Sequence, residues 1–205
     1  MIVNQNTLIE WVNAIGYIGI SVIVFAETAF FFGFFLPGDS LLFLAGLLAS
    51  RGLLSIWILV PLLLIASFFG YLFAYWFGKR LGDWLMHRPD SFWYKKSYID
   101  KAHQFYKRFG PVAVLLGRMV PVVRTFCGIV AGMVHMEFKL FLLFNFLGSL
   151  LWVCIFTILG YYIGDVFPNI VNYLMIVVLL IIVTTIAAPM IHEHIKKVKF
   201  KDGGS

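Results

Sequence analysis

The chain has 205 residues, of which 61% are hydrophobic and 13% are charged, and its formal net charge is +6. Soluble domains contain about 25% charged residues, so this composition excludes a soluble protein and indicates an integral membrane protein of one domain. The basic residues gather in residues 79–108 and 196–201. A membrane protein needs such basic segments to orient itself, so we expect no nucleic-acid partner.

The first apolar segment is predicted to span the membrane from about Leu8 to Ala26. Residues 1–11 contain neither a basic region nor a small-residue cleavage site, so we expect this segment to stay in the mature protein. Residues 8–49 as a whole are too long for one helix. They are also too short for two spans with a loop, because each span needs about 20 apolar residues.

Pro37 and Gly38 interrupt this apolar region. Proline removes a backbone donor and glycine permits a turn. Asp39 or Ser40 can then cap the helix that follows. We therefore predict a re-entrant helical hairpin that turns at Pro37-Gly38.

Three later segments carry no charge and are long enough to cross a bilayer: 53–78, 140–164 and 166–191. Together with the first segment they predict about four transmembrane helices. Between them, apolar residues recur at helical spacing in 97–109, beside lysine and arginine. This pattern predicts an interfacial helix on an anionic lipid surface, with a solvated connector as the alternative.

Residues 109–137 repeat the features of the first hairpin. Pro121 breaks the apolar run, and Arg118 and Arg124 flank it. Each arm has about 10–13 residues, which is too short to cross a bilayer. A second re-entrant hairpin is therefore predicted, and a break at Pro121 would let the two arginines converge.

The two hairpin regions indicate an internal duplication within a single domain, 1–202, with repeats at about 27–83 and 109–165. Residues 203–205 are interpreted as an appended linker. The correspondences are Pro37 with Pro121, Ala45-Gly46 with Ala131-Gly132, and Gly78 with Gly160. Interrupted apolar segments at matching positions in two halves point to the binding site of a transporter.

The basic segments 79–108 and 196–201 both belong in the cytoplasm under the positive-inside rule. This requires each hairpin to return to the face that it entered, because a full crossing at either would place one basic cluster outside. The hairpins then enter from opposite faces as an inverted repeat. Both chain ends are predicted to be cytoplasmic.

Four charges lie at membrane depth: Glu27, Asp39, Arg118 and Arg124. Such a charge costs about 2.5–3.5 kcal/mol unless it is paired, wetted or functional. We predict that Arg118 and Arg124 bind the phosphate of a lipid headgroup, because arginine has a forked donor array suited to phosphate. We predict that Glu27 and Asp39 couple or gate transport by protonation, since acids in this setting can take up and release protons. The alternatives are that the arginines form structural ion pairs with the acids, that Glu27 is wet at the interface, and that Asp39 only caps a helix.

No nucleophile, zinc or phosphate-loop motif is present, so we expect neither an enzyme nor a metal or cofactor. Two functions remain open besides transport of a lipid phosphate: a proton-coupled exporter of small cations or drugs, and an uncoupled phospholipid scramblase. The sequence does not determine whether the chain forms a homo-oligomer.

Glu27 and three sequence runs resemble the DedA family of bacterial inner-membrane proteins, which shares the VTT or SNARE-associated domain with eukaryotic lipid scramblases. The runs are FLPGDSLL at 35–42, GYLFAYWFGKRLG at 70–82 and FYKRFGPVAVLLGRMVPVVRTFCGIVAGMVHM at 105–136. The resemblance implies two opposed hairpins in the bacterial inner membrane. It implies transport of undecaprenyl phosphate and dependence on the proton motive force. It also places the family's essential acids on Glu27 and Asp39, and its essential arginines on Arg118 and Arg124.

Overall fold

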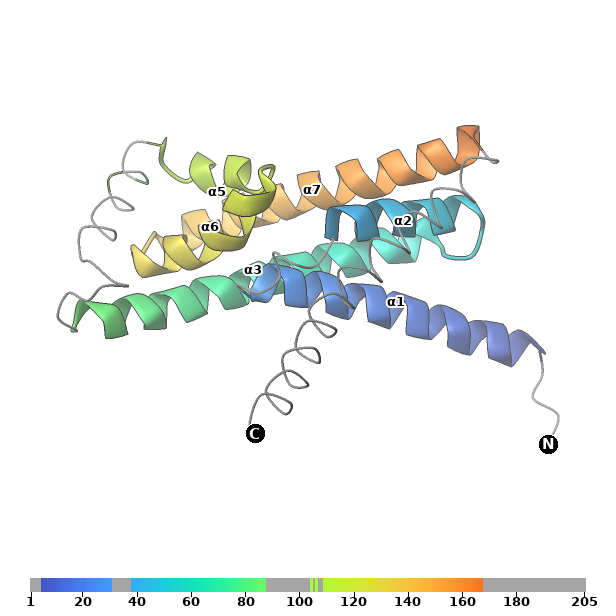
Figure 1. The fold of residues 1–205 in the computed structure, drawn as a ribbon, viewed down its shortest axis with the longest axis horizontal. Helices are drawn as coiled ribbons and strands as arrows, with labels where there is room; N and C mark the ends of the chain where they lie inside the picture. The colour runs from blue at the N-terminus through green and yellow to red at the C-terminus, as the bar shows by residue number, and fades with distance from the viewer. Residues whose placement is uncertain (1–4, 31–37, 88–103, 105, 107–108, 168–205) are drawn as a thin grey trace, which may run out of the picture.

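A computed structural model describes residues 5–30, 38–87, 104, 106 and 109–167. Its regular elements are helices only: α1 (Gln5–Ala29), α2 (Gly38–Ser50), α3 (Ile56–Met86), α5 (Val112–Gly117), α6 (Pro121–Met133) and α7 (Phe138–Val166) (Figure 1). The all-α prediction is confirmed for this part of the chain. The predicted span 166–191 from residue 168 onward, the turn residue Pro37 and most of segment 97–109 lie outside the described residues.

The two long helices, α3 and α7, cover most of the predicted apolar segments 53–78 and 140–164 and continue past the C-terminal end of each. Each has a mean hydropathy of 2.3 over its most apolar stretch. With 31 and 29 residues they are about 45 Å long, which exceeds the roughly 30 Å of a bilayer core. They run antiparallel along the centre of the molecule (Figure 1). Both are therefore long and apolar enough to cross a membrane.

Helix α1 is continuous to Ala29, three residues past the predicted end at about Ala26. Glu27 thus lies on the last turn of α1 and not on a hairpin arm. The reason is local, since Glu and Ala are good helix formers. The hydroxyl of Thr28 also donates to the carbonyl of Val24, at 2.8 Å, within the same helix.

The two short helices begin at the predicted breaks. Helix α2 begins at Gly38 and α6 begins at Pro121, and each has 13 residues, as predicted for a hairpin arm. Proline is favoured at the first helical position because the N–H it lacks would be unpaired there. The predicted length is wrong for the arm before Pro121, because α5 has only 6 residues.

Each short helix packs mainly on the long helix of the other half: α2 lies on α7, and α6 lies on α3. Helices α2 and α6 start near the middle of the molecule and run in opposite directions away from it (Figure 1). Two hydrophobic clusters lie on either side of this midpoint. One includes Leu42, Leu63 and Trp152, and the other includes Tyr75 and Phe141.

Glycines bring these helix pairs into backbone contact, and they do so in matching fashion in the two halves. A Cβ atom at Gly46 would overlap the carbonyl oxygen of Thr157, and one at Gly132 would overlap that of Tyr75. From the long helices, Gly160 meets the carbonyl of Phe43 and Gly78 meets that of Ile129. Small residues allow membrane helices to approach this closely. The glycines that make the contacts are those that the predicted duplication pairs.

We expect Gly46→Ala and Gly132→Ala each to lower the melting temperature in detergent by about 3–10 °C, because overpacking costs about 1–3 kcal/mol. Thermal unfolding followed by intrinsic fluorescence measures this. Gly19→Ala is the matched control, since nothing lies within 4 Å of a Cβ atom there. Equal melting temperatures for all three variants would contradict the close contacts.

Candidate functional site

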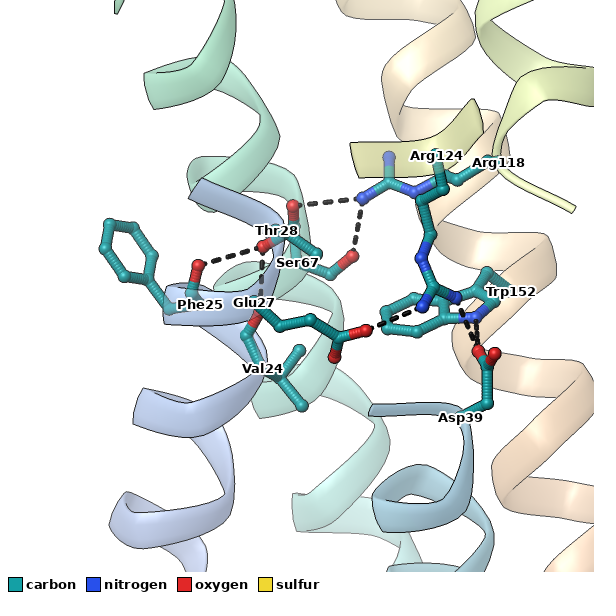
Figure 2. Close-up of polar contacts among 9 residues, drawn as sticks. All are labelled: Val24, Phe25, Glu27, Thr28, Asp39, Ser67, Arg118, Arg124 and Trp152. Atoms are coloured by element: carbon teal, nitrogen blue, oxygen red, sulfur yellow. Dashed lines mark hydrogen bonds and ion pairs between the residues drawn. The ribbon is translucent and has the colours of Figure 1, made fainter. Parts of the chain in front are cut away.

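Arg124, in the first turn of α6, is held between two carboxylates from other segments. Its Nη2 donates to Oε1 of Glu27 at 2.6 Å, and its Nη1 donates to Oδ1 of Asp39 at 2.5 Å. Figure 2 shows the guanidinium between the end of α1 and the start of α2. Arg124 is 6% exposed. The structure thus brings together three of the four charged residues that the sequence singles out.

Glu27 is the more enclosed of the two acids, with 1% of its surface exposed. The prediction that it could be wet at the interface is wrong. The first residue of α2 is packed against it, because a Cβ atom at Gly38 would overlap the Glu27 carboxylate. The start of a helix carries partial positive charge. Gly38 therefore lets this end of α2 approach the buried acid, besides starting the helix.

Asp39 lies in the first turn of α2 and its side chain is 30% exposed. The same oxygen that accepts from Arg124, Oδ1, also accepts from Nε1 of Trp152 at 2.7 Å. Trp152 is fully buried on α7, and its ring lies 4.6 Å from Cζ of Arg124. Asp39 lies inside α2, one residue after its start, and joins α2 to both α6 and α7, so the alternative that it only caps the helix is wrong.

Arg118 lies in the break between α5 and α6 and is fully buried. Its Nη1 donates to the side-chain and main-chain oxygens of Asn145 at 2.5 and 3.1 Å. Its Nη2 donates to the corresponding oxygens of Ser67 at 2.7 and 3.1 Å. Its Cζ lies 4.2 Å from the ring of Tyr71. Within the described residues no carboxylate lies at ion-pair distance from Arg118.

The two arginines therefore have different environments. Arg124 forms the ion pairs with Glu27 and Asp39 that one alternative predicted, whereas the described contacts of Arg118 are with neutral groups. One guanidinium is shared by two acids, and the second positive charge lies beside it (Figure 2). When all four groups are ionised the cluster is neutral. An anion can enter it by replacing a carboxylate on Arg124, and a proton can enter it by neutralising an acid.

The sequence analysis missed the neutral members of the site: Ser67, Tyr71, Asn145 and Trp152. Asn145 carried a signal, because it is an amide in an otherwise apolar helix, and polar groups in membrane helices usually bind a neighbouring helix. It also donates to the carbonyl of Phe68 at 3.1 Å. Trp152 carried no such signal, since tryptophan is common in membrane proteins.

Within the part of the chain that the structure describes, no group of three or more His, Cys, Asp or Glu residues could hold a metal ion. The described contacts of the site are ion pairs, hydrogen bonds and cation–π contacts.

Residues 36–162 match the VTT domain family. The chain is 43% identical over 178 residues to Protein DedA of Escherichia coli strain K12, a match that covers 86% of this chain and 79% of the relative. It is 36% identical over 154 residues to Inner membrane protein YqjA of the same strain, covering 72% of this chain and 67% of the relative. No solved structure matches. The matched domain contains Asp39, Arg118 and Arg124, and Glu27 precedes it.

Proposed function

This chain belongs to the DedA family of membrane proteins that carry the VTT domain, and we propose that it moves a lipid phosphate, undecaprenyl phosphate or a related phospholipid, across the bacterial cytoplasmic membrane. The observation that carries this proposal is the buried Arg124 between two carboxylates from separate segments. Guanidinium donates strong, charge-assisted hydrogen bonds to phosphate. A carboxylate displaced by the phosphate can then accept a proton, which gives a physical link between phosphate binding and the proton gradient.

The proposed architecture has four spans and two re-entrant hairpins that enter from opposite faces. Two observations support it. Helices α2 and α6 have 13 residues each, or about 20 Å, which is shorter than the bilayer core. They also start together near the midpoint of α3 and α7 and point in opposite directions (Figure 1). The matched glycine contacts support the inverted repeat.

This topology predicts which loops face the outside of the cell. A cysteine introduced beside Arg51 should react with an impermeant thiol reagent added to intact cells, whereas a cysteine beside Lys95 or Lys199 should react only after the membrane is permeabilised. Labelling beside Lys95 from outside would mean that one of the hairpins crosses the bilayer.

In the proposed cycle, phosphate and the two carboxylates compete for Arg124. Protonation of Glu27 or Asp39 weakens its hold on the guanidinium and favours phosphate binding. Loss of the proton on the other side of the membrane favours release. Arg118 contributes positive charge and, through Ser67 and Asn145, holds the helix break against α3 and α7. Its direct contact with phosphate stays a prediction.

Export of small cations or drugs is the second candidate, because two acids lie together in one buried site and share a single arginine. Proteoliposomes distinguish the candidates through a headgroup-accessibility assay with undecaprenyl phosphate and phosphatidylethanolamine, with and without a pH gradient. We expect undecaprenyl phosphate to cross faster when the gradient is imposed. Cation flux without lipid movement would favour the exporter, and lipid movement that ignores the gradient would favour an uncoupled scramblase.

The double variant Glu27→Gln/Asp39→Asn should reverse the pH dependence of binding. In the wild type, protonation of the acids at low pH frees Arg124, so undecaprenyl phosphate should bind more tightly as the pH falls. The double variant retains only the ionisation of the phosphate, which has its second pKa near 6, so its binding should weaken as the pH falls. Measuring the Kd for undecaprenyl phosphate at several pH values gives the slope of binding against pH for the wild type and for the double variant.

Asp83→Asn is the matched control, because this exposed acid pairs with His135 away from the cluster. It should keep the wild-type slope. A wild-type slope in the double variant as well would mean that the acids are structural and that protons couple elsewhere.

A further inference from the structure

Two buried donors converge on a single oxygen atom at the centre of the site. Nη1 of Arg124 lies 2.5 Å from Oδ1 of Asp39, and Nε1 of Trp152 lies 2.7 Å from the same atom (Figure 2). Arg124 is 6% exposed and Trp152 is fully buried. Converging donors at such distances are how proteins bind an anionic oxygen. The pair is therefore a preformed oxyanion site.

From this geometry we propose that the Asp39 carboxylate occupies the headgroup site as an internal substitute for a phosphate oxygen, and that Trp152 is a phosphate-binding residue. The inference deepens the proposed function and rests on it. A phosphate oxygen takes the place of Oδ1 and accepts from both Arg124 and Trp152. Asp39 is displaced as the phosphate enters.

The difference between the two acids supports this assignment. Glu27 is 1% exposed and its carboxylate is packed against Gly38, so it has no room to leave. The Asp39 side chain is 30% exposed and lies at the start of a helix. Glu27 thus keeps Nη2 of Arg124 paired while Asp39 releases Nη1. The arginine stays partly neutralised throughout, which avoids the cost of an unpaired buried charge.

The Trp152 ring is also placed to hold the Arg124 guanidinium in position. Its face lies 4.6 Å from Cζ of Arg124 and 6.0 Å from Cζ of Arg118. Cations are attracted to the face of an indole ring. One side chain therefore stacks on Arg124, lies near Arg118 and donates a hydrogen bond into the site. Phenylalanine at this position keeps most of the stacking surface and removes the donor.

A double-mutant cycle separates a phosphate-binding role for Trp152 from simple support of Asp39. The measured quantity is the Kd for undecaprenyl phosphate in detergent. Undecaprenol is the control that lacks the phosphate, and inorganic phosphate is the control that lacks the lipid tail. Asp39→Ala removes the internal substitute and should bind undecaprenyl phosphate more tightly than the wild type. Adding Trp152→Phe to Asp39→Ala should then weaken binding about tenfold, since a hydrogen bond to a charged group is lost.

If Trp152 only supports Asp39, its replacement will have no effect on Kd once Asp39 is gone, and the inference is overturned. Asp39→Asn provides a second background, which keeps the side-chain shape if Asp39→Ala does not fold. Trp57→Phe is the control for loss of an indole, because Trp57 is 86% exposed, and it should leave Kd unchanged. If neither the wild type nor any folded variant binds undecaprenyl phosphate, the proposed function itself fails. Binding of inorganic phosphate as tight as that of the lipid would identify free phosphate as the ligand.

Discussion

Replacing Arg124 with glutamine should abolish lipid phosphate transport and destabilise the protein by about 3–5 kcal/mol, the usual cost of removing one partner from a buried ion pair. The reason is that Glu27 and Asp39 both depend on this guanidinium. Glutamine cannot neutralise a carboxylate, so the two acids would face each other without a positive charge between them. Melting temperature in detergent and headgroup accessibility in proteoliposomes measure the two losses separately.

A triple variant without these charges distinguishes the loss of stability from the loss of transport. Arg124→Gln combined with Glu27→Gln and Asp39→Asn removes the charged trio together, and neutral replacement of a buried ionic group is often tolerated. We expect this variant to recover a melting temperature close to that of the wild type and to remain inactive in transport. Recovery of transport along with stability would show that these charges only hold the helices together.

Arg118→Lys should reduce both stability and transport, the latter at least tenfold. The guanidinium makes four hydrogen bonds, two to Asn145 and two to Ser67. An ammonium group is a compact point charge that cannot reproduce this fork. Because the contacts join the break before α6 to α3 and α7, losing them should loosen the segment that carries Arg124. Thermal unfolding and the proteoliposome assay test both effects.

The matched control is Arg80→Lys, since Arg80 is an exposed residue on α3. It should behave as the wild type does. Asn145→Ala should reproduce part of the Arg118→Lys loss, because it removes one of the oxygens that receive the guanidinium. An Arg118→Lys variant with unchanged melting temperature but weakened phosphate binding would instead make Arg118 a direct ligand, as the sequence analysis predicts.

The charged residues and the helix breaks could be predicted from sequence because both stand out against an apolar background. A charge or a proline inside a membrane segment has a large energetic cost, and Gly38 and Pro121 begin helices where the sequence places the breaks. The pairing of these charges could not be predicted in the same way. Nothing local distinguishes Arg124, which holds two acids, from Arg118, which binds a serine and an asparagine.

The packing of the helices could also be predicted only in part. The correspondence of Gly46 with Gly132 was predictable from their matching neighbours in the sequence. That each short helix lies on the long helix of the other half was not, because periodicity identifies an apolar face and says nothing about its partner. The role of Trp152 could not be predicted for a related reason. Its hydrogen bond to Asp39 joins residues 113 positions apart, and only the fold brings them together.

The long separations within the ion-pair cluster have a consequence for how the protein is made. Glu27 and Asp39 precede their shared arginine by 97 and 85 residues. At a synthesis rate of about 5–20 residues per second, the acids leave the ribosome roughly 4–20 s before Arg124. During that interval the two acids do not yet have their partner, and a charged carboxylate in hydrocarbon is costly. The ion pairs at Arg124 can therefore form only after the chain has been synthesised to residue 124.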